Sequence, residues 1–156
     1  MSDLDRALAF AYRYVNRRER TIHEVRARLE AKGIEPAITD QALAALVEQG
    51  VVDDGRFARL FVHDKRELEG WGADRIRRGL LARGIDRELA AEALAHVEDE
   101  NPETELERAL RLLRRRFVSA PRDRRERDRA LGVLIRKGYD PELALDALAA
   151  YGRDRT

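Results

Sequence analysis

The chain carries HEVRARLEAKGIEPAITDQALAAL at residues 23–46 and repeats its pattern as DRIRRGLLARGIDRELAAEALAHV at 74–97 and DRALGVLIRKGYDPELALDALAAY at 128–151. The three copies align without gaps on Gly33, Gly84 and Gly138, which lie 51 and 54 residues apart. Each copy has a leucine four residues before its glycine and an Ala-Leu pair nine residues after it. Self-similarity at such a period indicates a tandem array of one small structural unit.

The repeated unit is helical. Apolar residues recur at three-and-four spacing, as in Leu4, Leu8, Ala11 and Val15, and no stretch alternates apolar and polar residues as a strand would. Helix starts are equally visible. Thr21-Ile22-His23-Glu24 is a capping box, and Asp53 is an expected N-cap. Asn101-Pro102 and Asp140-Pro141 each place an N-cap residue before a proline at the first helical position.

The three aligned glycines mark corners between helices. Each follows a basic residue, as expected of a left-handed residue that ends a helix. A further helix precedes each helix pair, at about 3–16, 54–69 and 102–117. We therefore predict an all-α protein of three tandem three-helix repeats that form an elongated, curved, solenoid-like body. The expected units are residues 1–50, 51–99 and 100–156, the last with a short C-terminal tail.

Composition excludes several classes of protein. The 156 residues are 39% charged but 44% hydrophobic, which is enough apolar content for folded units. No apolar run is long enough to span a membrane, and the first residues lack the pattern of a signal peptide. The absence of cysteine excludes disulfides and thiolate metal sites. We expect a monomeric protein of the bacterial cytoplasm that does not associate with membranes.

Positive charge is unevenly distributed. All but three of the 31 basic residues are arginine, and the net charge is only +1. Residues 86–107 contain nine acids and one base, net −8, whereas residues 108–137 contain twelve bases and three acids, net +9. Arginine can bind phosphates and carboxylates with two parallel hydrogen bonds. A GC-rich genome, which enriches arginine and alanine together, explains the composition equally well.

Catalytic patterns are missing from the sequence. His23, His63 and His96 are spread over three units without a metal-binding spacing, and Gly70-Trp71-Gly72 lacks the third glycine and the preceding strand of a nucleotide loop. We expect a protein that is not an enzyme and that needs no cofactor and no metal.

Three features are candidates for binding a partner: the basic block that follows the acidic segment, the arginine-rich helix of the middle unit, and the single tryptophan. Their residues are Arg114, Arg115, Arg116, Arg124, Arg125, Arg127, Arg136 and Lys137; Arg75, Arg77, Arg78 and Arg83; and Trp71. Two plainer interpretations stay open. The basic block can simply neutralise the acidic segment beside it, and Trp71 can pack across its own corner.

The repeat and its motifs resemble the RecX family, bacterial regulators of the RecA recombinase. The most specific match is VVDDGRFARLFV at 51–62, followed by GWGADRIRRGL at 70–80 and Arg83-Gly84-Ile85. The first unit fits through Arg20-Thr21, Glu24-Val25-Arg26, Leu29 and Lys32-Gly33. The third unit is a looser match, since Ala130 replaces a bulkier residue.

The resemblance implies a function. A member of this family would bind along the groove of the RecA–DNA filament and inhibit recombinase, ATPase and co-protease activity in DNA repair and the SOS response. It would act by capping the filament, blocking its groove or disassembling it, and would need no cofactor. Single- or double-stranded DNA within or beside the filament is a further expected partner.

Two other functions fit the sequence. Three-helix units resemble helix-turn-helix modules, so a direct DNA-binding protein is the main alternative, although a net charge of +1 is low for one. A plain scaffold explains the repeat but leaves the motif at 51–62 without a role.

Overall fold

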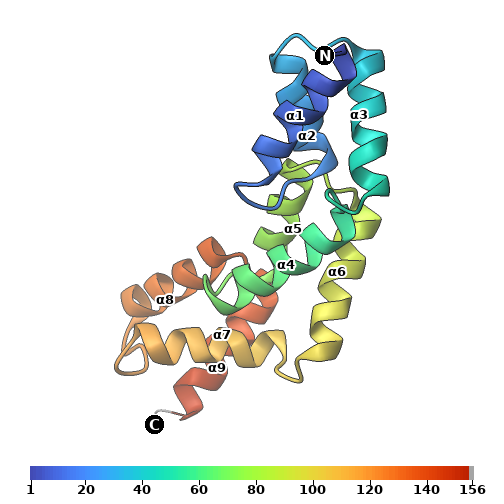
Figure 1. Ribbon diagram of the computed structural model, residues 1–156. Coiled ribbons are helices and arrows are strands. Elements are labelled where there is room, and N and C mark those ends of the chain that lie inside the picture. The colour runs from blue at the N-terminus through green and yellow to red at the C-terminus, as the bar shows by residue number, and fades with distance from the viewer. Residues whose placement is uncertain (155–156) are drawn as a thin grey trace.

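The computed structural model describes residues 1–154, which form nine α-helices and no strand. Figure 1 shows them as three stacked groups in an elongated, bent body, as predicted. The helices are α1 (Asp3–Val15), α2 (Ile22–Ala31), α3 (Pro36–Glu48), α4 (Asp54–Glu67), α5 (Ala73–Ala82), α6 (Arg87–Glu100), α7 (Glu105–Arg116), α8 (Arg124–Lys137) and α9 (Pro141–Asp154).

Each group of three helices has its own apolar core. The first and third helices of a group pack along each other, and the second helix closes the group. Leu29 and Leu80, the leucines four residues before two of the corner glycines, are fully buried in the cores of the first and second units. Val52 is buried in the core of the first unit, and Tyr139 and Tyr151 in that of the third. We retain 1–50, 51–99 and 100–156 as proposed unit boundaries.

Local capping explains most helix starts. Thr21 and Glu24 form the complete capping box, with the Glu24 amide donating to Thr21 Oγ1 at 3.0 Å. Asp53 accepts from the Arg56 amide at 3.0 Å. Asp140 accepts from the amides of Glu142 and Leu143, at 3.1 and 3.2 Å. These three predicted starts are confirmed.

The predicted start at Asn101-Pro102 is wrong. Helix α7 begins at Glu105, and its N-cap is Thr104, whose side chain accepts from the Glu107 amide at 3.1 Å. Asn101 instead ends α6 and accepts from the Glu103 amide at 3.0 Å. Thr104 and Glu107 have the spacing of a capping box. This local signal prevailed over the Asn-Pro pair.

The corner glycines also join the units. Gly33, Gly84 and Gly138 all have positive φ, at 79°, 86° and 97°. A side chain on Gly84 would overlap His23 at the start of α2, and one on Gly138 would overlap Arg75 in α5. The N-terminus of the second helix in one unit therefore rests on the C-terminal corner of the second helix in the next. This head-to-tail contact pairs opposite ends of the helix dipoles.

Candidate functional site: a cationic groove between the second and third units

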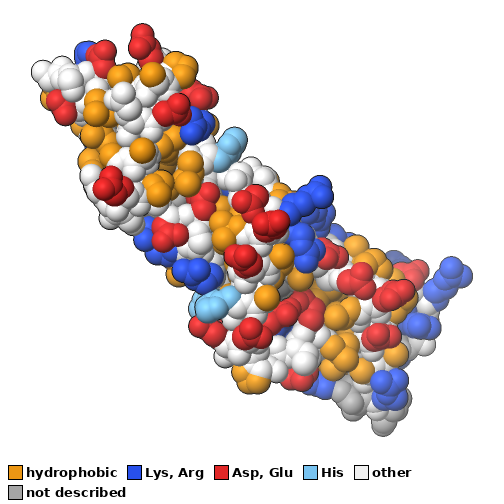
Figure 2. Space-filling model, turned by 90° about the vertical axis from the view of Figure 1, so that its right-hand side faces the viewer, with side chains coloured by type: hydrophobic (Ala, Val, Ile, Leu, Met, Phe, Trp, Pro, Cys, Tyr) orange, Lys and Arg blue, Asp and Glu red, His pale blue; other side chains and the backbone are white. Residues whose placement is uncertain are grey.

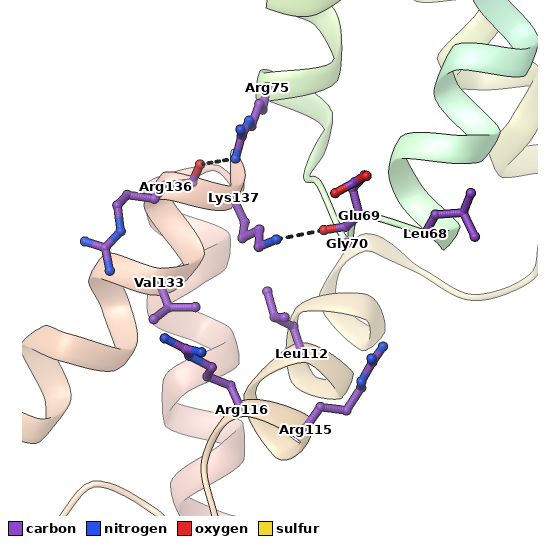
Figure 3. Close-up of a pocket in the computed structure, with 10 residues that line it drawn as sticks. All are labelled: Leu68, Glu69, Gly70, Arg75, Leu112, Arg115, Arg116, Val133, Arg136 and Lys137. Atoms are coloured by element: carbon purple, nitrogen blue, oxygen red, sulfur yellow. Dashed lines mark hydrogen bonds between the residues drawn. The ribbon is translucent and has the colours of Figure 1, made fainter.

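A large hollow lies where the second unit meets the third (Figure 3). It has a volume of about 610 Å³ and is lined by the segment after α4, one residue of α5, and the facing sides of α7 and α8. Five of its ten lining residues are cationic and one is acidic. They are Leu68, Glu69, Gly70, Arg75, Leu112, Arg115, Arg116, Val133, Arg136 and Lys137. We call this hollow the cationic groove.

Two of the cations hold the groove together. Arg75 stacks on the Trp71 ring at 4.0 Å and donates to the Arg136 carbonyl at 3.1 Å. Lys137 Nζ donates to the Glu69 carbonyl at 2.8 Å. Both bonds cross from the second unit to the third (Figure 3). Arg75 is half-buried, so this candidate binding residue first serves to position the two units.

Three other cations are open to a ligand. Arg115, Arg116 and Arg136 are exposed, and among the side chains of residues 1–153 no ion pair to a carboxylate is found for any of them. In Figure 3, Arg115 and Arg116 diverge from α7, one on each side of Leu112. Guanidinium groups without carboxylate partners bind phosphate or carboxylate oxygens through parallel hydrogen bonds. The groove therefore has a cationic rim around the apolar side chains of Leu112 and Val133.

A buried polar cluster fixes the junction beneath the groove. Glu105 accepts from the Ala73 amide at 3.2 Å and from Arg108 Nη2 at 2.9 Å. Burial raises the pKa of the Glu105 carboxyl, with the Ala73 amide and Arg66 partly offsetting this. Tyr139 donates to the Gly70 carbonyl at 3.2 Å, and burial raises the pKa of its phenol, which keeps it a neutral donor. The segment bordering the groove is thus tied to the third unit.

Arg66 is the least expected member of this junction. It is 2% exposed, and none of its guanidinium nitrogens has a hydrogen-bond partner within the described chain. Arg108 is equally buried but differs from Arg66 in having hydrogen-bond partners. Besides its bond to Glu105, it donates to the Glu103 carbonyl at 2.8 Å. Both arginines were missed by the sequence analysis. Their positions on amphipathic helices carry no signal of burial, because a charged residue is normally exposed.

The structure gathers only part of the predicted site. Arg75, Arg115, Arg116, Arg136 and Lys137 line the groove, and Trp71 lies beneath Arg75. Trp71 packs across its corner, edge-on to Phe61 with ring centroids 6.1 Å apart. The groove residues that the sequence did not suggest are Leu68, Glu69, Gly70, Leu112 and Val133. Only the three-dimensional arrangement brings them together.

The other predicted arginines lie outside the groove. Arg77 pairs with Asp74 at 3.2 Å, and Arg78 Nε donates to the Asp74 carbonyl at 3.4 Å. Arg83 donates to the Gly79 carbonyl at 2.9 Å and covers the Phe61 ring. The remaining four are exposed, one on α7 and three at the start of α8: Arg114, Arg124, Arg125 and Arg127.

Charge is separated over the molecule. Figure 2 shows the side on which α3 and α6 lie in Figure 1, and on the middle and lower parts of this face acidic side chains lie among Lys and Arg side chains. Helix α6 contributes exposed acids along its length, namely Glu88, Glu92, Glu98, Asp99 and Glu100. The net charge of +1 therefore conceals an acid-rich helix, α6, and a cationic groove. Such separation orients a partner whose own charge is uneven.

The geometry suits binding. Where the structure describes side chains, in residues 1–153, no three of histidine, aspartate or glutamate are grouped as metal ligands would be. None of the helices described here is both long and apolar enough to cross a bilayer. The groove combines cationic side chains with the apolar side chains of Leu112 and Val133, within an elongated molecule.

Comparison with known proteins places this architecture in a family. Three family models match in order along the chain: the first three-helix domain of RecX at residues 7–46, the second at 53–94 and the third at 103–148. Their order and spacing follow the three helical units.

Individual relatives agree. The chain is 39% identical over 139 residues to the regulatory protein RecX of Chromohalobacter salexigens, covering 89% of this chain and 88% of that one. It is 32% identical over 151 residues to the regulatory protein RecX of Mycolicibacterium vanbaalenii, covering 94% and 82%. The crystal structure of RecX from Lactobacillus salivarius has the same fold, with a TM-score of 0.82, 20% identity and 96% of each chain covered. The three family models and these relatives together show that the chain belongs to the RecX family of regulatory proteins.

Proposed function

We propose that this protein binds in the groove of a RecA–DNA filament and inhibits its recombinase, ATPase and co-protease activities during DNA repair and the SOS response. It does so as a monomer and by binding alone, without catalysis and without a cofactor. The observation that carries this proposal is the cationic groove, in which Arg115, Arg116 and Arg136 are exposed without carboxylate partners.

The shape of the molecule supports a filamentous partner. Three units in a row present a long surface that exceeds what a small molecule requires. Groups on that surface are mixed. Leu81 on α5 and Ile135 on α8 are exposed apolar side chains at matching positions, each three residues before a corner glycine. Mixed apolar and cationic surface suits a protein assembly that also carries phosphates.

The proposal is tested by reversing charge in the groove. We expect Arg115→Glu with Arg136→Glu to melt like the wild type, because both side chains are exposed, and to weaken inhibition of RecA ATPase at least about tenfold. The matched control is Arg124→Glu with Arg125→Glu, which makes the same change in charge at the start of α8. If the two double variants inhibit equally well, the groove is not the contact surface.

The family name alone does not exclude a direct DNA-binding protein. Binding to DNA without RecA loses affinity steeply with salt, whereas docking on a protein filament through mixed contacts retains more of it. A pull-down of RecA with and without DNA, repeated at increasing salt, separates the two. Capture of RecA that depends on the groove arginines supports the proposal. Capture of bare DNA with equal strength favours the alternative.

A further inference from the structure

The first unit carries two aromatic rings covered by cations, on a face remote from the groove. Phe10 and Tyr14 lie one turn apart on α1, about 6 Å along the helix axis. Lys32 lies over the Phe10 ring at 4.9 Å and Arg20 over the Tyr14 ring at 3.9 Å. Arg28 contacts both rings, at 5.6 and 5.5 Å from their centroids. We call Phe10, Tyr14, Arg20, Arg28 and Lys32 the aromatic strip.

The cations of the strip are not neutralised by neighbouring acids. Among the side chains described, those of residues 1–153, Arg20, Arg28 and Lys32 form no ion pair with a carboxylate. Other basic residues of the same unit do, since Arg26 pairs with Asp40 at 2.7 Å and Arg18 with Glu24 at 3.6 Å. The strip is therefore a positive surface, in which the three cations lie over the two rings and Arg20 also donates to the Tyr14 carbonyl.

We propose that the aromatic strip binds single-stranded nucleic acid. Proteins that hold single strands combine cations along the backbone with aromatic rings on which successive bases stack. Phe10 and Tyr14 are half-buried, and Arg28 and Lys32 are exposed side chains whose positive ends can turn from the rings to phosphates. Bases can then take the place of the cations on the Phe10 and Tyr14 rings. The guanidinium plane of Arg28 adds a further stacking surface.

Charge and ring geometry favour this ligand over two others. A duplex keeps its bases stacked inside, so it can use the cations but not the rings. An acidic peptide can pair with the cations but has no base to place on Phe10 and Tyr14. The strip shares no residue with the cationic groove, so this inference does not rest on the proposed function.

The ring contribution is tested by binding of a fluorescent oligothymidylate, measured by anisotropy. The background is the Arg115→Glu, Arg136→Glu variant, which removes any contribution of the groove. Tyr14→Leu keeps an apolar side chain but removes the ring, and we expect at least about fivefold weaker binding. Phe10→Leu should act in the same direction. The control is Tyr12→Leu on the same helix, where the tyrosine hydroxyl instead donates to Gln49, the C-cap residue of α3.

The charge contribution is tested by salt dependence. Each phosphate contact on a single strand contributes about 0.7 to the slope of log affinity against log salt, so Arg28→Gln with Lys32→Gln should reduce the slope by about 1.4. Arg26→Gln, which removes a cation already paired with Asp40, should leave the slope close to that of the parent.

Three results would overturn the inference. The first is equal binding by the Tyr14→Leu and Tyr12→Leu variants. The second is binding of a duplex as tight as that of oligothymidylate. The third is binding of polyglutamate of matched charge with the same affinity, which would assign the strip to acidic protein segments. Weaker binding by both ring variants and a reduced salt slope would together support it, whatever the groove variant does to RecA.

Discussion

The Asp54 carboxylate accepts a hydrogen bond from the Ile22 amide at 2.9 Å, across the junction between the first and second units. Glu105 and the Ala73 amide repeat this bond at 3.2 Å between the second and third units, 51 residues further along on both sides. In each case an acid at the start of one unit's first helix caps the start of the preceding unit's second helix. An acid near a helix N-terminus is stabilising, and here it also joins two units.

Burial at this junction makes stability depend on pH. Desolvation raises the pKa of the Asp54 carboxyl above its ordinary value of 3.8, and the Ile22 amide only partly offsets this. The folded chain then binds more protons than the unfolded chain between the two pKa values. The contribution of Asp54 to stability is therefore complete below pH 3.8 and is lost as the pH rises through the folded-state value.

Asp54→Asn removes the loss of stability that accompanies ionisation of Asp54, because an amide does not ionise. It keeps an oxygen that can accept a hydrogen bond from the Ile22 amide. We expect the difference in melting temperature, variant minus wild type, to increase as the pH rises from about 4 to about 6. Thermal melts followed by circular dichroism across this range measure the difference. A difference that stays constant or falls with pH would contradict the burial of Asp54.

The corner glycines allow strain to be separated from contact between units. Gly33 has φ 79° and open space around it, whereas Gly84 has φ 86° and lies against His23. Gly33→Ala should cost about 1–2 kcal/mol, from the left-handed backbone alone. Gly84→Ala should cost clearly more, because its methyl group also displaces the first unit. If denaturant unfolding shows that both variants lose the same free energy of unfolding, contact with His23 adds nothing to the cost at Gly84.

Leu80 tests the repeat alignment. It is fully buried in the core of the second unit, and Leu81 beside it is 36% exposed. Leu80→Ala should lower the free energy of unfolding by about 2–5 kcal/mol, as should Leu29→Ala at the matching position of the first unit. Leu81→Ala is the control, with a much smaller expected loss. Urea unfolding of the three variants decides the matter, and a Leu80→Ala variant as stable as Leu81→Ala would contradict the shared core position.

The two buried arginines should respond differently to replacement. Arg66 is buried without a hydrogen bond in the described structure, so Arg66→Met should keep or raise the melting temperature, because an apolar side chain of similar length avoids the desolvation of a charge. Arg108→Met should lower it, because Glu105 and the Glu103 carbonyl lose a donor. Differential scanning calorimetry compares the two, and a larger loss for Arg66→Met would show that its charge stabilises the junction.

Local rules made much of this fold predictable from sequence. Thr21 with Glu24, Asp53 and Asp140 satisfy amides within a few residues of themselves, so helix starts follow from short motifs. The rule failed at Pro102 because two competing signals lay three residues apart, and Thr104 formed the cap. The positive φ of Gly33, Gly84 and Gly138 was equally predictable, because a left-handed residue after a helix favours glycine.

The candidate site was predictable only in part. Charge along the chain pointed to Arg75, Arg115, Arg116, Arg136 and Lys137 but could not separate them from Arg77 or Arg125, since all are arginines or lysines on helices. The groove forms where the segment at Leu68–Gly70 meets α7 and α8, which no spacing in the sequence encodes. The aromatic strip was missed for the same reason: Arg20 and Arg28 reach Phe10 and Tyr14 only when α2 packs on α1.

The repeat, the all-helical class, most helix ends and the corner glycines follow from the amino-acid sequence, because they depend on contacts within a turn or two of the chain. Which charged side chains are buried, paired or exposed depends instead on how the helices pack. Arg66 and Arg136 are both helical arginines, yet one is buried at a junction and the other borders the groove. Their difference arises from the way units stack, and that depends on the distant neighbours each side chain meets in space.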